Sequence, residues 1–147
     1  MKYFQNIKFT ILTDTSNSWN HLTMASYYYR LQGNVQKALK CARLAVLLAP
    51  RTHKDIPLLS LGTILFRVGR LNDAEILLTA AVEHAAEVAD NCLTLASALA
   101  MKHDFNRSLF YFDIAESLDP SLLPRTMAIR NFIFCLDNLT KKTHKMY

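Results

Sequence analysis

Glycine and proline are scarce in this chain of 147 residues, which has three glycines and four prolines. Three glycines are too few for most of the glycine-rich loops that hold nucleotide phosphates. The sequence also contains neither a nucleophile-elbow motif nor a HExxH motif. These absences argue against an enzyme, and no residue pattern indicates a cofactor. The scarcity of glycine and proline beside abundant leucine and alanine is typical of an all-α protein.

Paired cysteines are also lacking. Cys41, Cys92 and Cys135 are odd in number, far apart in the sequence and set in apolar surroundings, with no CxxC among them. This pattern argues against a structural zinc site or a redox pair and favours reduced thiols. The single cluster of acids and histidine, at residues 83–87, has no further convergent ligand, so we expect no metal site.

No run of about 18 apolar residues occurs, so we expect no transmembrane helix. The apolar stretch after Lys8 is too short for a signal peptide. Together with the reduced thiols, this predicts a cytoplasmic protein. The formal net charge of +5 is compatible with an acidic partner. Because most of the basic residues are scattered, we interpret them as a solvated surface.

A fixed spacing occurs three times along the chain. Gly33, Gly69 and His103 are 36 and 34 residues apart, and each precedes a small residue by five positions and an alanine by twelve. Such a period predicts stacked helix pairs that approach closely over small side chains. His103 must then adopt a left-handed backbone conformation, or another turn, in place of glycine. The small residues are Ala38, Ala74 and Ser108, followed by Ala45, Ala81 and Ala115.

The predicted fold class is all-α, a right-handed helical-repeat solenoid of three helix pairs plus a C-terminal capping helix. Its last helix would cover the end of the stack with an apolar stripe of Met127, Phe132, Ile133 and Leu136. The predicted parts are an N-terminal tail at 1–17, a repeat domain at 18–140 with repeats at about 19–52, 55–88 and 89–122, a capping helix at 123–139, and a basic tail at 141–147.

These positions resemble the tetratricopeptide repeat (TPR) family. Ser26, Gly62 and Ala96 match its small first-helix residue, and Tyr29, Leu65 and Leu99 match its aromatic or apolar one. Segments 17–19, 51–56 and 105–108 resemble the C-terminal repeat region of one large family member, which is linked to actin filament organisation and cilium assembly. The resemblance implies a non-catalytic scaffold with a protein or peptide ligand, actin-associated or ciliary partners, and association with the cytoskeleton.

The resemblance also implies that the first helix of each repeat lines a concave groove. This groove is mostly apolar, so we expect it to take an apolar helix or an extended peptide. Tyr27, Leu59, Phe66 and Leu93 would be its anchors, with Arg30 and Arg67 at the rim. The predicted partner-binding residues are Asn20, Thr23, Tyr27, Arg30, Leu59, Thr63, Phe66, Arg67, Leu93 and Ser97.

Chaperone-binding members of the family hold a C-terminal carboxylate with lysine, asparagine and arginine in this groove. The corresponding positions here are uncharged or acidic, so we expect no such clamp from them. They are Thr23, Tyr27, Ser60, Asp90 and Thr94.

Three alternatives remain at this point. The groove is filled by the chain's own tail or by a neighbouring helix. The chain is an RNA-binding helical repeat, which the pI of about 9.2 suggests but apolar groove residues such as Ile56 disfavour. Lastly, the chain is a structural segment that packs on a larger parent protein. We expect no small-molecule substrate and no nucleic acid partner.

Overall fold

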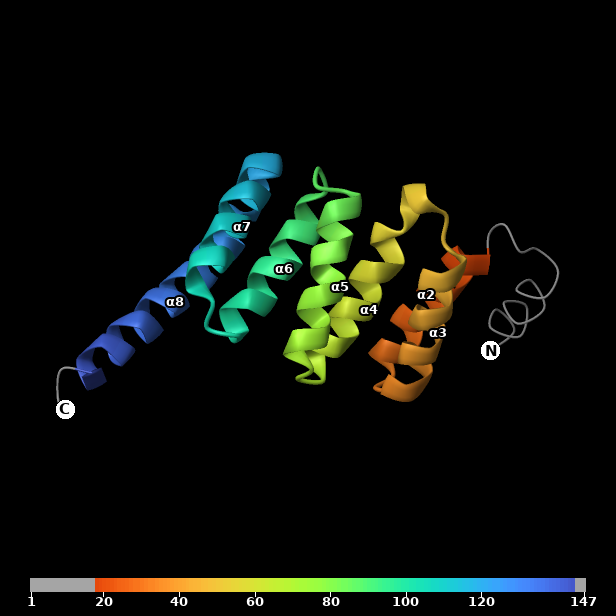
Figure 1. Cartoon of the computed structure of the whole chain (residues 1–147), viewed down its shortest axis with the longest axis horizontal. Coiled ribbons are helices and arrows are strands. Elements are labelled where there is room, and N and C mark those ends of the chain that lie inside the picture. The colour runs from red at the N-terminus through yellow and green to blue at the C-terminus, as the bar shows by residue number, and fades with distance from the viewer. Residues whose placement is uncertain (1–17, 145–147) are drawn as a thin grey trace. The chain divides into compact units, whose positions relative to one another are not determined.

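The structure is a computed structural model that describes residues 18–144. In this range the chain forms seven α-helices and two short 3-10 helices and contains no strand (Figure 1). It divides into two compact units, Met1–Ala86 and Glu87–Tyr147. The first unit holds α2 (Ser18–Leu31), α3 (Val35–Leu48), η1 (Arg51–His53), α4 (Asp55–Arg67) and α5 (Leu71–His84). The second holds α6 (Ala89–Met101), α7 (Phe105–Leu118), η2 (Pro120–Leu122) and α8 (Leu123–His144).

The predicted fold class is confirmed, because α2 pairs with α3, α4 with α5, and α6 with α7, and a seventh helix follows. The exact repeat boundaries stay a prediction. The predicted N-terminal tail at 1–17 lies outside the described residues, as do residues 145–147. No described helix has the length and apolar character required to cross a membrane.

The turns inside the three helix pairs share the same backbone geometry. Gly33 and Gly69 have φ of 73° and 82°, and His103 has φ of 62°, so of the two possibilities left open for the histidine it adopts the left-handed conformation. Each turn is closed by a backbone N–H of the residue that follows, donated to the carbonyl five residues earlier, as in a Schellman motif. These bonds join Asn34 to Tyr29, Arg70 to Leu65 and Asp104 to Leu99.

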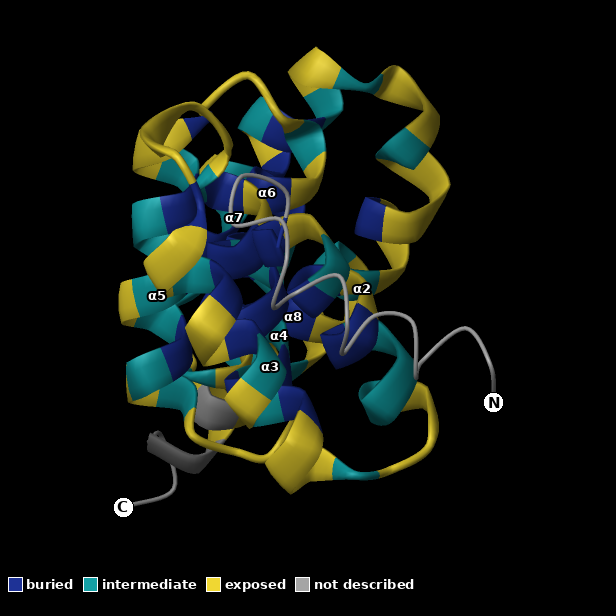
Figure 2. Ribbon diagram, turned by 90° about the vertical axis from the view of Figure 1, so that its right-hand side faces the viewer, coloured by how far each residue is buried: buried dark blue, intermediate teal, exposed yellow. Residues whose placement is uncertain are grey.

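Small side chains let the helices of a pair approach closely, as the sequence predicts. Ala38, Ala42 and Ala45 of α3 are fully buried. In α4, a Cβ added to Gly62 would lie 2.7 Å from Cδ2 of Leu78 on α5, so only glycine fits without displacement. Figure 2 shows the resulting core as buried segments on the inner sides of the helices.

The first unit is also tied together between its pairs. Helix α4 packs against both α2 and α3. The hydroxyls of Ser26 and Ser60 are 2.8 Å apart and link α2 to α4. The buried Trp19 ring contacts the His53 ring edge-on, with centroids 5.7 Å apart, and so fixes the start of α2 against η1.

Helix α8 differs from its prediction in two ways. It continues to His144, beyond the predicted end at 139, so the predicted basic tail begins as helix. The predicted apolar stripe is also wrong in part, because Met127 and Phe132 are 50% and 52% exposed, whereas Thr126 and Ile133 are buried. A helix offers several apolar stripes, and its neighbour α7, rather than its own sequence, selects the one that is covered.

Candidate protein-binding face

The α2–α4 face consists of the side chains that Tyr27 and Arg30 present from α2 and that Leu59, Phe66 and Arg67 present from α4. They recur at helical spacing on one side of each helix. The two helices lie in contact within the first unit. Tyr27, Arg30, Leu59 and Phe66 are half-buried and Arg67 is exposed. The face therefore offers aromatic, aliphatic and cationic groups together.

Arg30 and Arg67 lie in the last turns of α2 and α4 and border the same cleft. The Arg30 guanidinium lies over the Tyr27 ring, 4.9 Å from its centroid. Burial lowers the pKa of Arg30, the nearby positive charge of Arg67 lowers it further, and Tyr27 opposes both effects. Two like charges in a partly desolvated place repel each other, so the site favours an anion.

A small cleft lies beside these arginines. Its volume is about 160 Å³, and Val35, Ile64 and Val68 form its apolar wall while Arg30 and Arg67 border it. The sequence prediction did not include the three wall residues. They could have been found only from the packing of α3 on α4, because residue spacing does not give the register between helices.

Two predicted groove residues are buried. Thr23 is 1% exposed, and its hydroxyl donates to the Trp19 carbonyl at 2.8 Å. Leu93 is 3% exposed on α6. Neither presents a side chain for contact with a ligand in this structure.

The remaining predicted residues differ in exposure. Asn20 is exposed near the start of α2, whereas Thr63 and Ser97 are half-buried. The Thr63 hydroxyl donates to the Leu59 carbonyl and the Ser97 hydroxyl to the Leu93 carbonyl, so both bond within their own helices. Leu93 and Ser97 belong to the second unit. The predicted residues that the structure brings together are therefore those of α2 and α4.

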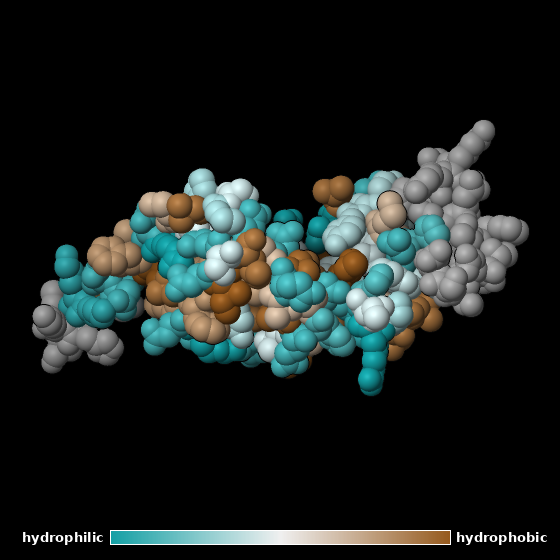
Figure 3. Space-filling view, turned by 90° about the horizontal axis from the view of Figure 1, so that it is seen from above, coloured by the Kyte–Doolittle hydropathy of each residue, from teal (hydrophilic) through white to brown (hydrophobic). Residues whose placement is uncertain are grey.

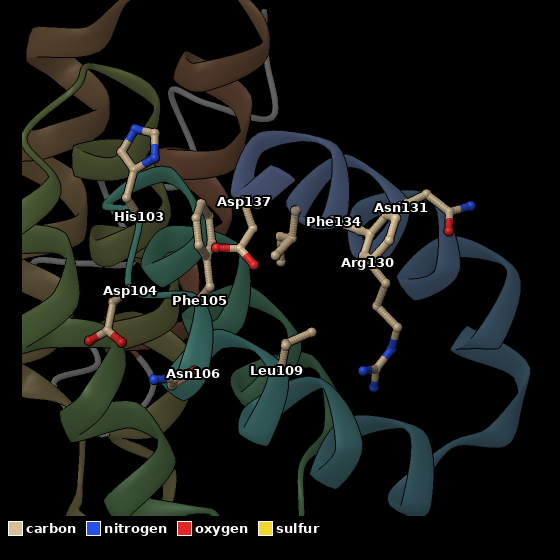
Figure 4. A pocket seen from close by; sticks show the side chains of 10 residues that line it. His103, Asp104, Phe105, Asn106, Leu109, Arg130, Asn131, Phe134 and Asp137 are labelled. Carbon is tan, nitrogen blue, oxygen red and sulfur yellow. The ribbon is translucent and has the colours of Figure 1, made fainter. Parts of the chain in front are cut away.

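A larger hollow of about 550 Å³ lies between α7 and α8 in the second unit (Figure 4). Phe105 and Leu109 of α7 and Phe134 of α8 contribute apolar surface to it. The Arg130 side chain borders the hollow, but it binds Asp113 at 2.6 Å and another acid of α7. Because its cation is already paired, this hollow has mainly apolar character to offer a ligand.

The acidic partners of Arg130 also change its pKa. Burial lowers the pKa of Arg130, but the hydrogen bonds to Asp113 and Glu116 outweigh this, and the pKa is raised overall. Sequence reasoning missed this cluster. The available signal was two acids three residues apart on one helix and two arginines, Arg125 and Arg130, on the next.

A separate cationic surface follows α3. Lys40 and Arg43 are exposed there, and Lys37 lies over the Tyr29 ring at 5.4 Å. Together with Arg70 they border a shallow hollow. We call Lys37, Lys40 and Arg43 the α3 basic face.

The residues for metal or thiol chemistry do not converge in the part of the chain that the structure describes. No group of three or more histidine, cysteine, aspartate or glutamate residues there could hold a metal ion. The three cysteines form no disulfide among the described residues, and burial raises the pKa of Cys92 and of Cys41. A raised pKa keeps a thiol protonated and unreactive.

The helix pairs, the left-handed turns and the small-residue period define a tetratricopeptide-type helical repeat. The crystal structure of MamA has the same fold, with a TM-score of 0.69, 16% identity, and coverage of 94% of this chain and 87% of that one. No family model matches the chain. Fold and sequence nevertheless place it among tetratricopeptide repeat proteins.

The particular protein that it resembles is tetratricopeptide repeat protein 17. The human protein is 36% identical over 114 residues, which are 78% of this chain. The mouse protein gives the same identity and coverage, and the zebrafish protein is 27% identical over 131 residues. The chain spans about a tenth of the length of these relatives. The predicted match to the C-terminal region of this relative stays a prediction.

Proposed function

We propose that this chain is a protein–protein interaction scaffold that binds its partner through the α2–α4 face. Tetratricopeptide homology supports the scaffold. The observation that supports this face is that α2 and α4 are in contact and leave Tyr27, Phe66 and two arginines incompletely buried. Aromatic and arginine side chains dominate the energy of many protein interfaces.

The cellular process that we propose comes from the resemblance to tetratricopeptide repeat protein 17. It is a role in actin filament organisation and cilium assembly, with a cytoskeletal location. The chain, which spans about a tenth of the length of these relatives, would supply one binding surface for such an assembly.

The test is affinity capture from a ciliated cell lysate with the purified chain, followed by co-sedimentation with filamentous actin. We expect actin-associated or ciliary proteins to be captured and the Tyr27→Ala/Phe66→Ala variant to lose them. The matched control is Phe132→Ala/Phe134→Ala, which removes two exposed aromatic rings from α8.

Two results would contradict the proposal. If the Tyr27→Ala/Phe66→Ala variant retained the same proteins, the α2–α4 face would not be the binding surface. If only RNA were recovered, and its affinity fell steeply with salt, a nucleic-acid-binding repeat would replace the protein scaffold.

A further inference from the structure

We propose that Arg30 and Arg67 together bind carboxylate groups of an acidic segment in the partner protein, with an apolar side chain of that segment in the adjacent cleft. This inference rests on the proposed function and names the chemistry of the partner. The pair lies in the last turns of α2 and α4, not at the groove positions where chaperone-binding relatives hold their cations.

The first observation is that both cations lack an acidic partner in this structure. Among residues 18–144, no carboxylate forms an ion pair with Arg30 or Arg67. Some of the other arginines do have such partners; Arg70, for example, binds Asp73 at 2.5 Å. An arginine that is partly desolvated gains most from a carboxylate, since the planar guanidinium donates two parallel hydrogen bonds to it.

The second observation is the preorganisation of Arg30. Its guanidinium stacks over the Tyr27 ring at 4.9 Å, so the long side chain is held before any ligand arrives. An ordered side chain loses less entropy when it binds than a free one does. A carboxylate between the two arginines would also relieve their mutual repulsion.

The third observation is the apolar cleft next to the pair. Val35, Ile64 and Val68 line about 160 Å³ of space, which is sufficient for one aliphatic side chain but not for a large ligand. The site therefore matches a peptide in which an acidic residue lies next to a leucine, isoleucine or valine.

The position of each arginine, taken alone, can be explained by a structural role. A cation in the last turn of a helix interacts favourably with the helix dipole. That role requires neither the stacking of Arg30 on Tyr27 nor the approach of Arg67 to Arg30. The α3 basic face is the other candidate for an acidic partner. Its cation over an aromatic ring is Lys37, which lacks the planar pair of donors that arginine has, and Arg70 beside its hollow is already bound to Asp73.

The experiment uses the whole chain and three fluorescein-labelled peptides of alternating leucine with glutamate, glutamine or phosphoserine. Fluorescence anisotropy gives each dissociation constant at low and physiological salt. We expect the glutamate peptide to bind the wild-type chain at least about tenfold more tightly than the glutamine peptide. Arg30→Gln/Arg67→Gln should abolish this preference, and Arg30→Lys/Arg67→Lys should restore it only in part.

The matched control is Lys40→Gln/Arg43→Gln, which removes the same charge from the same unit and should keep the preference. Equal binding of the glutamate and glutamine peptides would overturn the proposal, as would an equal loss in the control variant. Markedly tighter binding of the phosphoserine peptide would replace the carboxylate with a phosphate ligand. The circular dichroism melting temperature checks that each variant is folded.

The two proposals can fail separately. A partner captured from lysate that needs Tyr27 and Phe66 but remains bound to the Arg30→Gln/Arg67→Gln variant would leave the scaffold in place and overturn only the carboxylate site. Loss of the partner with both variants, but not with the α3 basic face control, would support both.

Discussion

Helices α4 and α8 each follow a short 3-10 helix, yet they bury very different surfaces. In α4, Leu61, Ile64 and Leu65 are at most 6% exposed, because α3 packs on one side and α5 on another. In α8, Phe132 and Phe134 are 52% and 68% exposed (Figure 3 shows apolar side chains at the surface among hydrophilic ones). A helix of this repeat therefore becomes part of the core only where a neighbouring helix covers it.

The largest expected effect comes from truncating one apolar side chain in each helix. Leu65→Ala in α4 should lower the free energy of unfolding by about 2–5 kcal/mol, because it leaves a cavity. Phe134→Ala in α8 removes a larger side chain but should change stability by no more than about 0.5 kcal/mol. Urea denaturation followed by far-ultraviolet circular dichroism measures both. Similar losses of unfolding free energy for the two variants would show that α8 is buried as deeply as α4.

A smaller effect is expected from adding a side chain. Gly62→Leu in α4 must displace Leu78, since the new Cβ would lie 2.7 Å from that side chain, and should destabilise by about 1–3 kcal/mol. The control Ala128→Leu in α8 adds a branched side chain at an exposed position, where helix propensity is nearly unchanged. The thermal midpoint should fall only for the first variant. A fall of equal size for Ala128→Leu would show that α8 is as tightly covered as α4.

The smallest expected change in stability comes from substitutions in the turns of the helix pairs, one in each unit. Gly69→Ala forces a side chain into a left-handed conformation and should cost about 1 kcal/mol. His103→Gly removes that strain in the second unit but makes the unfolded chain more flexible, so the net gain should be about 0.5 kcal/mol. The urea midpoints of the two variants should therefore move in opposite directions. A lower midpoint for His103→Gly would mean that the contact of His103 with the Phe105 ring outweighs the strain.

The sequence was sufficient to predict the helix pairs, because close packing over Ala38 and Ala74 requires small residues at a fixed period, and that period is visible in one dimension. The histidine turn was predictable for the same reason. The covered face of α8 could not be predicted from the sequence. Thr126 and Met127 are adjacent in the chain, and only the neighbouring helix decides which of them is buried.

The candidate site was predictable in composition but not in geometry. Arg30 and Arg67 were expected at the rim of a groove, each near a turn. Their approach to each other depends on the register of α2 against α4, which residue spacing within a helix does not contain. The burial of Thr23 was not predictable either, because it depends on how the helices pack. Its hydroxyl can be buried since it donates to a carbonyl of its own helix.

The bond between Ser26 and Ser60 has a consequence for how far α2 can slide along α4. A displacement by one helical turn, about 5.4 Å, would break the 2.8 Å contact and leave a buried hydroxyl without this partner, at a cost of about 1–3 kcal/mol. The close packing of small side chains around it opposes the same displacement. Ser26 precedes Arg30 by one turn and Ser60 precedes Arg67 by two. The serine pair thus favours one register of α2 against α4, and that register brings Arg30 and Arg67 to the same cleft.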